Sequence, residues 1–400
     1  MKAVILAAGE GKRMYPLTST SPKVMMPVAN KPLIEHLLSE IYRAGIQHFI
    51  IVVGYRAEKI RDYFRDGSRW GVKIEYVTQR KQLGTSDAVR QVLPNIDQSF
   101  LLANGDVLIE KEEICKLMLQ TATTVGLAIA KNTSGLGVVE LEGDTIIRIH
   151  EKPENPPTNL ANTGVYFITP DAFPSIYETE LSQRGEYEFT HSLQMLIDRR
   201  VPVLGQVVNS WHNISYPWDL IDTNEALLGE LETSFIGKVE EGAMVKGPVL
   251  IGEDSLVRSG SYIEGPAILG SDCHIGPNCY IRPFTAIGDR CHIGSSVEIK
   301  NSIIMKDTKI PHHNYVGDSV IGEKCNIGAG TKIANLRLDK GEIHCMGINT
   351  YRKKLGAILG ENVQVGINAS INVGTVIGHN STIGPGALVN GMILPNSRIM

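Results

Sequence analysis

The chain of 400 residues has no excess of charge of one sign, because 39 Lys and Arg residues against 43 Asp and Glu residues give a formal net charge of −4. Proteins that bind nucleic acid or anionic membranes through a general field carry a clustered positive excess. We therefore expect neither a nucleic-acid partner nor a membrane partner. No apolar run approaches the roughly 20 residues that span a bilayer. The apolar start is short and is broken by Gly9, so we expect no signal peptide and a cytoplasmic protein.

Several common ligand-binding motifs are missing as well. None of the six cysteines stands in a C-x-x-C pair, which argues against a zinc site or a redox motif. The loop Gly9-Glu10-Gly11 is not followed by the third glycine of a Rossmann dinucleotide fingerprint, and no G-K-[ST] of a Walker loop is present. A phosphate-binding function must therefore be argued from other residues.

The chain opens with a short apolar run, residues 3–6, followed by the glycine-rich loop Ala7-Ala8-Gly9-Glu10-Gly11-Lys12-Arg13. Such a run is typical of a buried parallel strand. Glycine lets the main chain approach a ligand closely, so that successive N–H groups can converge on phosphate oxygens. Arg13 and Lys23 add positive charge that the backbone cannot supply. We predict a nucleotide phosphate site that includes Ala8, Gly9 and Gly11.

The first part of the chain alternates between strand and helix patterns, which favours a parallel α/β sheet. We expect strands at 49–53, 72–77 and 99–103 and helices at 33–41 and 56–64. Ligands of such sheets bind beyond the carboxyl ends of the strands. The Gly9 loop, residues 79–85 and Asp106 all follow strand patterns, so we expect them to converge. A carboxylate beside a phosphate loop suits Mg²⁺, which prefers one or two protein carboxylates together with phosphates.

The second part of the chain carries a six-residue repeat. One column of aliphatic residues steps by six from Val239 to Val389, with a few phase shifts. A hexapeptide repeat is the sequence mark of a parallel β-helix. Two positions before each aliphatic residue the side chain is small, and four of the six cysteines stand in this column, at 273, 279, 291 and 325. We interpret them as buried small residues, not as ligands. The expected domains are 1–230 and 235–400.

The string L-A-A-G-x-G-x-R-M-x-P-L-T, followed by P-K-x-M-x-P-V-x-N-K-P-L-I-E-H, lies within residues 6–36. It resembles the signature of the sugar-1-phosphate nucleotidylyltransferases. The resemblance implies a Rossmann-like nucleotidyltransferase domain of the α/β class. It also implies attack of a sugar-1-phosphate oxygen on the α-phosphorus of a nucleoside triphosphate, with release of pyrophosphate. Such a reaction needs positioning and charge neutralisation more than a protein nucleophile.

This resemblance also implies roles for individual residues. Arg13 and Lys23 would be catalytic, and the base of UTP or dTTP would contact Gln79, Gly84 and Thr85. Mg²⁺ would be held by Asp106 and by Asn213, which stands where many relatives have aspartate. The sugar and its phosphate would be bound by Asn104, Gly137, Glu151, Lys152 and Asn162.

Four motifs in the repeat region occur in a recognisable order: Arg282-Pro283, Val297-Glu298-Ile299-Lys300, His312-x-x-Tyr315-Val316-Gly317-Asp318 and Asn326-Ile327-Gly328-Ala329-Gly330-Thr331. They resemble glucosamine-1-phosphate N-acetyltransferase of the hexapeptide acyltransferases. The resemblance implies a left-handed parallel β-helix, acetyl-CoA as a substrate, and a homotrimer or a multiple of trimers with sites between neighbours.

Carried over, Arg282 and Lys300 would bind the sugar phosphate and His312 would be the general base, while the aminosugar would be positioned by Tyr315, Asn326 and Asn335. An imidazole with a pKa of about 6.5 can take the proton that an amine loses on attacking a thioester. The chain departs from the family in having Asn335-Leu336 in place of an Asn-Tyr pair and in its long loop 337–354. Glucosamine-1-phosphate and galactosamine-1-phosphate therefore both stay open as acceptors, and so does His313 as the base.

Together the two resemblances predict a bifunctional enzyme that makes UDP-N-acetylglucosamine, similar to the archaeal type of N-acetylglucosamine-1-phosphate uridylyltransferase/glucosamine-1-phosphate acetyltransferase. The alternative is a single-function glucose-1-phosphate thymidylyl- or uridylyltransferase with an oligomerising β-helix, which the Tyr15-Pro16-Leu17-Thr18 string favours. A non-enzymatic scaffold would be expected to have lost Arg13, Lys23 or Asp106, and all three are present.

Overall fold

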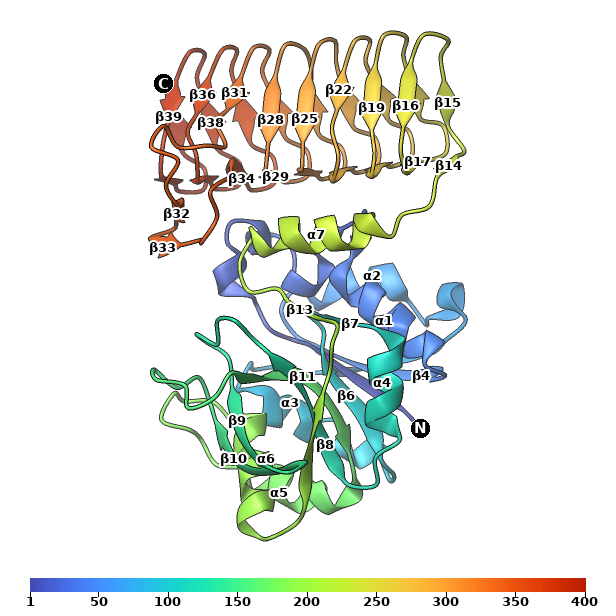
Figure 1. Ribbon diagram of the computed structural model, residues 1–400, viewed down its shortest axis with the longest axis vertical. Helices are drawn as coiled ribbons and strands as arrows, with labels where there is room; N and C mark the ends of the chain where they lie inside the picture. Colours follow the sequence, from blue (N-terminus) through green and yellow to red (C-terminus); the bar gives the residue numbers. More distant parts are fainter. The chain divides into compact units, whose positions relative to one another are not determined.

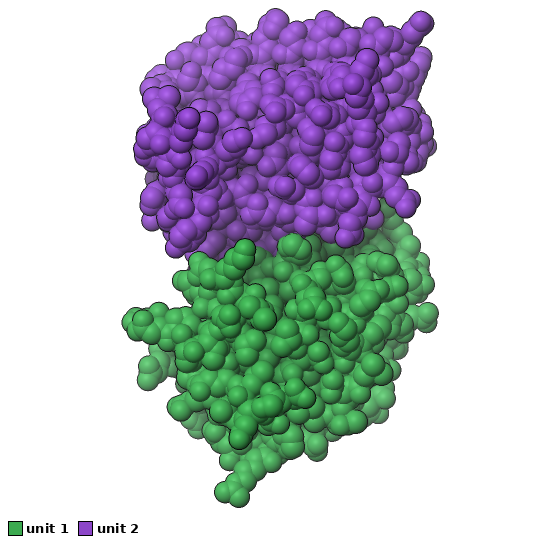
Figure 2. All heavy atoms as spheres, in the orientation of Figure 1, with its two compact units in different colours: residues 1–10, 22–25, 33–213 green, residues 11–21, 26–32, 214–400 purple.

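The computed structural model describes residues 1–400, and they form two compact units (Figure 2). Unit 1 comprises Met1–Glu10, Pro22–Met25 and Leu33–Asn213, and unit 2 comprises Gly11–Ser21, Met26–Pro32 and Ile214–Met400. No helix combines the length and the apolar character that crossing a membrane requires.

Unit 1 is built on a nine-stranded mixed sheet in the order β5-β4-β1-β6-β11-β8-β12-β10-β9. Four neighbours at one side are parallel, and β11 turns antiparallel to β6. Their bounds are β1 (Ala3–Ala7), β4 (His48–Val53), β5 (Lys73–Thr78), β6 (Phe100–Asn104), β8 (Thr123–Ile129), β9 (Val138–Glu142), β10 (Thr145–His150), β11 (Leu160–Ile168) and β12 (Val203–Val207). A short two-stranded sheet pairs β7 (Val107–Ile109) with β13 (Trp211–Asn213).

Helices cover both faces of this sheet because the central strand β1 is apolar on both sides. Ile5 packs into one core with α1 (Leu33–Arg43), α2 (Ala57–Phe64) and α4 (Lys111–Met118). Val4 packs into the other core with α3 (Thr85–Arg90), α5 (Phe173–Glu178) and α6 (Phe189–Asp198). The predicted strands and helices are confirmed to within two residues of their ends.

Unit 2 is a triangular coil made of three parallel sheets, whose rungs stack along one axis (Figure 1). The first face has β14 (Ser234–Phe235), β17 (Val249–Ile251), β20 (Ala267–Leu269), β23 (Thr285–Ile287), β26 (Ile303–Ile304), β29 (Val320–Ile321), β34 (Ala357–Leu359), β37 (Thr375–Ile377) and β40 (Met392–Ile393). The second has β15 (Lys238–Val239), β18 (Leu256–Val257), β21 (His274–Ile275), β24 (His292–Ile293), β27 (Lys309–Ile310), β30 (Asn326–Ile327), β35 (Gln364–Val365), β38 (Thr382–Ile383) and β41 (Arg398–Ile399). The third has β16 (Met244–Lys246), β19 (Tyr262–Glu264), β22 (Tyr280–Ile281), β25 (Glu298–Lys300), β28 (Tyr315–Gly317), β31 (Lys332–Ile333), β36 (Ser370–Ile371) and β39 (Leu388–Val389).

The register explains the six-residue period. Val239 pairs with Val257, so one coil takes 257 − 239 = 18 residues, or three repeats. Ile299 pairs with Val316, so this coil is one residue shorter and the repeat changes phase there. The aliphatic column lies inside the prism and is almost wholly buried from Ile251 to Val389. The predicted α/β fold with a left-handed parallel β-helix is confirmed.

Two further elements belong to unit 2. The outer surface of the first face is apolar, and Leu228 of α7 (Asp219–Gly229) packs there against Ile268 and Ala286. The loop 337–354 leaves the coil as an arm that contains the hairpin of β32 (His344–Cys345) and β33 (Ile348–Asn349). The remaining short strands, β2 (Pro27–Val28) and β3 (Lys31–Pro32), form a small hairpin.

The cysteines in the small-residue column are buried, as predicted. Cys273, Cys279, Cys291 and Cys325 are at most 2% exposed, and all six cysteines of the chain are free thiols. Burial raises the pKa of Cys273 and of Cys279 to about 11. Their spacing therefore follows from the coil and not from a shared ligand.

This burial predicts the thiol reactivity of the native protein. A thiolate reacts with a disulfide reagent and a thiol does not, so a raised pKa and a buried sulfur both slow the reaction. At about pH 8 we expect rapid modification of Cys115 alone, the one partly exposed cysteine, and of all six thiols after unfolding in guanidinium chloride. The absorbance of the released aromatic thiolate counts the groups. Cys115→Ser should remove the rapid phase, and rapid reaction of Cys273, Cys279, Cys291 or Cys325 in the native protein would contradict the coil assignment.

Candidate active sites

The glycine-rich loop of unit 1 follows the central strand β1. The Ala8 carbonyl accepts a hydrogen bond of 3.0 Å from the Tyr55 N–H, which ties the start of the loop to the segment after β4. A Cβ built on Gly9 would meet no atom within 4 Å, and the φ of Gly9 lies outside the left-handed region. The protein's own packing therefore does not require glycine at position 9. The open space beside it can admit a ligand.

Gly11 and Arg13 lie in the segment Gly11–Ser21, which is part of unit 2. Gly11 has a φ of 71°, a conformation that glycine adopts readily, and its carbonyl accepts a bond of 3.0 Å from the Thr18 hydroxyl. Arg13 lies in a short 3₁₀ helix, Lys12–Met14, and is exposed. The catalytic role of Arg13 stays a prediction.

Lys23 and Asp106 are brought together from distant parts of the sequence. The Lys23 Nζ lies 2.5 Å from Asp106 Oδ2, and the two side chains are 13% and 29% exposed. Asp106 stands in the turn between β6 and β7, next to Val107, and Val107 pairs with Asn213 across the β7–β13 ladder. The two predicted metal ligands thus lie on adjoining strands.

Asp106 and Asn213 offer the hard oxygen donors that Mg²⁺ prefers. No group of three or more His, Cys, Asp or Glu side chains is arranged so that it could hold a metal ion by itself. A magnesium ion that shares its ligands with phosphates needs no such group, because one or two protein oxygens suffice. The donor set therefore fits Mg²⁺ bound together with a nucleotide and does not fit a closed metal site.

The segment predicted to contact the base is held by hydrogen bonds and close packing within the chain. Gln79 is buried, and its Nε2 donates to the Gly84 carbonyl at 3.0 Å and to Asp87 Oδ2 at 2.7 Å. Both N–H groups are thereby used, and the Gln79 carbonyl oxygen faces the other way as an acceptor. Gly84 has a φ of 120°, and a Cβ there would come within 2.5 Å of the Tyr187 carbonyl. Position 84 requires glycine for the fold itself, unlike position 9.

The residues predicted to bind the sugar lie on the antiparallel part of the sheet. A Cβ on Gly137 would meet Glu151 Oε2 at 3.4 Å and the Asn162 Cβ at 3.7 Å, so these three residues are neighbours. The Asn162 amide donates to the Tyr166 hydroxyl at 3.0 Å, and its oxygen accepts from the Gly164 N–H at 3.0 Å.

Asn104 and Thr85, the other two predicted ligands of unit 1, are each held by a main-chain neighbour. Asn104, at the end of β6, packs against Gly164, where a Cβ would lie 2.4 Å from Asn104 Nδ2. The Thr85 hydroxyl, at the start of α3, accepts a hydrogen bond of 2.9 Å from the Phe189 N–H. Asn104, at the carboxyl end of a strand, is thus connected through Gly164 to Asn162, one of the residues predicted to bind the sugar.

Glu151 is the centre of a charged cluster. Its Oε1 lies 3.1 Å from Lys152 Nζ and 3.3 Å from the Arg184 guanidinium, and its Oε2 accepts from the Thr190 hydroxyl at 2.9 Å. Arg184 also pairs with Glu188 at 3.2 Å. Burial, reinforced by the nearby negative charge of Glu151, raises the pKa of Glu188 above its usual value.

Four residues of these networks were not predicted from the sequence: Asp87, Arg184, Glu188 and Thr190. The last three lie on and before α6, more than 30 positions from Glu151 in the sequence, and the fold brings them to it through the contacts of Arg184 and Thr190. No local motif or period marks them, so the sequence offered no signal for their placement.

Four of the predicted acetyl-transfer residues gather along one edge of the coil's third face. The Arg282 guanidinium lies 2.9 Å from Glu298 Oε1 and 5.6 Å from the centre of the Tyr280 ring. The hydrogen bond that Arg282 donates to the Glu298 carboxylate raises the pKa of Arg282, which stays cationic. Lys300, one coil further on, pairs in register with Gly317.

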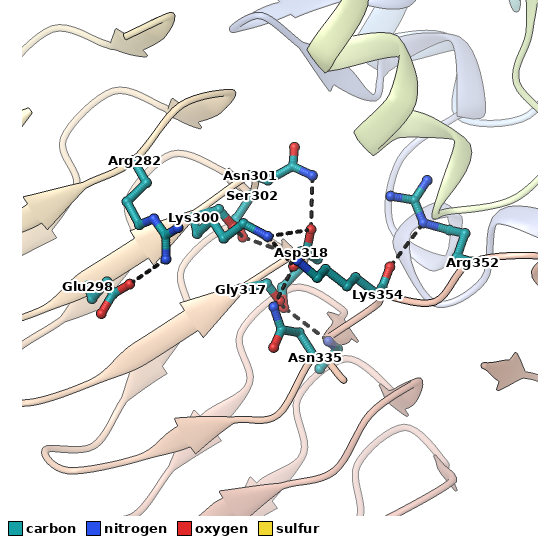
Figure 3. A network of polar contacts seen from close by, with 12 residues as sticks. Arg282, Glu298, Lys300, Asn301, Ser302, Gly317, Asp318, Asn335, Arg352 and Lys354 are labelled. Carbon is teal, nitrogen blue, oxygen red and sulfur yellow. Dashed lines mark hydrogen bonds and ion pairs between the residues drawn. The ribbon is translucent and has the colours of Figure 1, made fainter. Parts of the chain in front are cut away.

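Asp318 is a buried carboxylate that connects the predicted residues of the next coils. Its Oδ2 lies 3.2 Å from Lys300 Nζ and 2.5 Å from Asn335 Nδ2, and its Oδ1 accepts from Asn301 Nδ2 at 2.9 Å. Figure 3 shows the three side chains pointing toward this carboxylate. Burial, and then the negative charge of Asp318, raise the pKa of Tyr315. Asp318 stands within the motif His312-x-x-Tyr315-Val316-Gly317-Asp318, but no role for it was predicted from the sequence.

His312 and Asn326 lie elsewhere on the coil. His312 and His313 are exposed at the corner that precedes β28, with their rings 5.8 Å apart in an edge-to-face arrangement. Asn326 stands on β30 of the second face. No hydrogen bond or ion pair joins His312 or Asn326 to the group around Asp318. One chain therefore distributes the predicted residues over two faces of the prism.

The arm 337–354 is anchored at both ends. The Leu355 N–H donates to the Asn335 carbonyl at 3.0 Å, and Leu336 bridges to Lys354. Arg352 forms an ion pair with Asp222 of α7. The arm thus holds Asn335 at its base, and Leu336 beside it is 43% exposed.

The two units define the class of this protein, a nucleotidyl transferase joined to a hexapeptide-repeat coil. The family described as "Nucleotidyl transferase" matches residues 2–230. The "GMPPB C-terminal domain" matches residues 263–372, and the "Hexapeptide repeat of succinyl-transferase" matches residues 356–390.

The chain belongs to the family of the bifunctional protein GlmU. It is 40% identical over 403 residues to the "Bifunctional protein GlmU" of Methanocaldococcus jannaschii, covering 99% of this chain and 97% of that one. It is also 40% identical to the "Bifunctional sugar-1-phosphate nucleotidylyltransferase/acetyltransferase" of Sulfurisphaera tokodaii, covering 98% and 97%. A solved UDP-glucose pyrophosphorylase complexed with UDP-glucose is 25% identical with a TM-score of 0.52, covering 57% of this chain and 98% of that one. The predicted enzyme class, with a nucleotidyltransferase and an acetyltransferase, is confirmed.

The open surroundings of Gly9 predict a variant that affects the ligand and not the fold. Gly9→Ala should change the free energy of unfolding by no more than about 0.5 kcal/mol, because the added methyl group meets nothing. It should raise the KM for UTP by about tenfold, equivalent to about 1.4 kcal/mol of lost binding, because the methyl group occupies the approach to the phosphates. Thermal unfolding and pyrophosphate release measure the two effects. Gly229→Ala, equally open at the end of α7, is the control, and an equal KM in both variants would contradict the phosphate role.

Proposed function

We propose that the protein makes UDP-N-acetylglucosamine in two reactions, acetyl transfer to glucosamine-1-phosphate in residues 235–400 and uridylyl transfer in residues 1–230. Membership of the bifunctional family over the whole chain supports both reactions. The observation that carries the proposal is the presence of two separate sets of cations. Lys23 and Lys152 lie in unit 1, and Arg282 and Lys300 lie on the coil.

In the uridylyl reaction, a phosphate oxygen of the sugar-1-phosphate attacks the α-phosphorus of UTP, the new P–O bond forms, and pyrophosphate leaves. Lys23, Arg13 and Lys152 neutralise the charge of the phosphates. The Gln79 carbonyl oxygen accepts a hydrogen bond from the imide N–H of the pyrimidine, a group that UTP and dTTP share. Asp106 and Asn213 would hold Mg²⁺, which supplies charge neutralisation between the phosphates when it is bound.

In the acetyl reaction, the amine of the sugar attacks the thioester carbonyl of acetyl-CoA, so that an N–C bond forms and the C–S bond breaks. Coenzyme A leaves as the thiolate, and His312 takes the proton that the amine loses and passes it to the thiolate, so that free thiol is released. Arg282 and Lys300 bind the sugar phosphate, and the aminosugar is positioned by Tyr315, Asn326 and Asn335. Galactosamine-1-phosphate is a second acceptor in this proposal, because Leu336 replaces the tyrosine ring that the family has next to Asn335.

We further propose that the working form is a homotrimer or a multiple of trimers. The separation of His312 and Asn326 from the group around Asp318 supports a site completed by a neighbouring copy of the chain, because no contact within one chain joins the two sets. The cytoplasmic location and the small-molecule partners stay predictions of the same kind.

Two assays with matched histidine variants test the proposed function. With acetyl-CoA and glucosamine-1-phosphate but no nucleotide, the wild type should release free thiol, and with UTP and N-acetylglucosamine-1-phosphate it should release pyrophosphate. His312→Ala should lower thiol release by about 10²–10⁴-fold, the contribution of a general base, and leave pyrophosphate release unchanged. His313→Ala, at the same corner, is the control.

Each other outcome of these assays has a distinct meaning. No thiol release from the wild type would leave the single-function pyrophosphorylase, with a coil that only oligomerises. Loss of both activities in His312→Ala would contradict two independent sites. If His313→Ala is the inactive variant instead, His313 is the base.

Removal of the metal should separate the two reactions. We expect EDTA to abolish pyrophosphate release and to leave thiol release unchanged, because Asp106 and Asn213 lie in unit 1 alone. Asp106→Asn should lower pyrophosphate release by roughly 100-fold, the scale of losing one group that stabilises transition-state charge. Asp144→Asn, in an exposed turn of the same unit, is the control. Pyrophosphate release that persists in EDTA would refute the magnesium site.

A further inference from the structure

Asp318 is the most buried carboxylate of the coil and lies at the centre of a polar network. Its side chain is 3% exposed, against 20% for its partner Lys300. Three side chains donate to its two oxygens (Figure 3): the Lys300 ammonium and the amides of Asn301 and Asn335. Burial of a charge is unfavourable unless it is paired and hydrogen-bonded, and here both conditions are met.

The carboxylate fixes the orientation of the Asn335 amide. An ionised carboxylate only accepts hydrogen bonds, so Asn335 must turn its NH₂ group toward Asp318, at 2.5 Å. The Asn335 carbonyl oxygen then faces away from Asp318 as an acceptor. A Cβ on Gly317 would lie 2.6 Å from the Tyr315 hydroxyl and 2.7 Å from Asn335 Nδ2, so the absence of a side chain at Gly317 lets these groups meet.

The same carboxylate holds the Lys300 ammonium. A lysine ammonium has three N–H donors on a flexible stem, and one fixed anion selects among its many rotamers. Lys300 Nζ lies 3.2 Å and 3.5 Å from the two Asp318 oxygens, which leaves a third donor of the partly exposed ammonium for a ligand. Lys300 also accepts a main-chain bond of 2.9 Å from the Asp318 N–H, so the two residues are locked coil to coil.

We propose that Asp318 is a positioning residue for acetyl transfer, which joins the phosphate-binding Lys300 to the acceptor-binding Asn335. This inference rests on the proposed acetyltransferase function. Asp318 holds the ammonium where the sugar phosphate binds and presents the Asn335 carbonyl oxygen to a donor, the amine or a hydroxyl of the aminosugar. It acts through these two side chains and does not touch the substrate.

The backbone allows an isosteric test. Asp318 has a φ of 48°, in the left-handed region that asparagine also tolerates, so Asp318→Asn keeps the corner of the coil. Asp307 is a matched control, with a φ of 62° and an ion pair of 2.7 Å to Arg290 at another corner of the coil. Asp307→Asn makes the same chemical change outside the site.

In Asp318→Asn the ammonium of Lys300 loses its counter-charge, and the new amide can donate to or accept from Asn335. We expect the KM for glucosamine-1-phosphate to rise about tenfold or more, the scale on which loss of an outer partner weakens a ligand-binding side chain. The KM for acetyl-CoA should stay within about twofold, and pyrophosphate release should be unchanged. Asp307→Asn should match the wild type in all three.

A double-mutant cycle with Lys300→Ala separates positioning from a general structural effect. If Asp318 acts through Lys300, the loss from Lys300→Ala should be at least about threefold smaller in the Asp318→Asn background than in the wild type. Equal rises in both KM values, or additive losses in the cycle, would overturn the positioning role.

Two outcomes remain distinguishable from each other. No thiol release from the wild type would refute the proposed function, whereas an active wild type with an equally active Asp318→Asn would refute this inference alone. If Asp318→Asn does not fold, the exchange variant Asp318→Asn/Asn335→Asp keeps one carboxylate and one amide in the network. It should fold and still show the raised KM for the sugar phosphate, and an unchanged KM in that variant would overturn the inference.

Discussion

Parallel backbone pairing between successive coils is the constraint on which the second half of this protein depends. Ile281 pairs with Ile299 and Ile299 with Val316, so residues at equal positions of consecutive coils lie directly above one another. A slip by one residue would move the aliphatic column to the outside and polar residues to the inside. The core therefore fixes the register, and the register fixes which surface residues form a row. Arg282 and Lys300 are neighbours for this reason alone.

The two units share a second feature. In both of them, each of the four predicted phosphate-binding cations has a carboxylate partner. Lys23 lies beside Asp106, Lys152 beside Glu151, Arg282 beside Glu298 and Lys300 beside Asp318. An isolated cation on a long side chain is mobile, and a fixed carboxylate reduces the conformational entropy that ligand binding must offset. The pairs also keep each site close to neutral before the anionic substrates bind. The small net charge of the chain, −4, agrees with cations used locally in this way.

Much of the fold and part of the site followed from local sequence patterns. The strands that form the parallel part of the unit 1 sheet were predicted because continuous apolar runs are the mark of buried parallel strands. The coil was predicted because only a six-residue repeat returns an aliphatic residue to the interior on each face. Asp106 was singled out by its place after a strand, and the structure sets it against Lys23 at 2.5 Å. By contrast, Arg184 and Glu188 reach Glu151 across the fold, and no pattern near them in the sequence indicates that contact.

By itself, the sequence determined the two architectures, the burial of the cysteines and the family to which the chain belongs. Each of these follows from residues that are close together in the sequence or that recur at a fixed period. The tertiary structure decided which side chains are in contact. Gln79 donates both its N–H groups to Gly84 and Asp87, and Asp318 fixes the orientation of the Asn335 amide. Other contacts of the sites join residues far apart in the sequence, such as Lys23 and Asp106, which are 83 positions apart. Their geometry depends on strand order and coil register, which arise only when the whole chain packs.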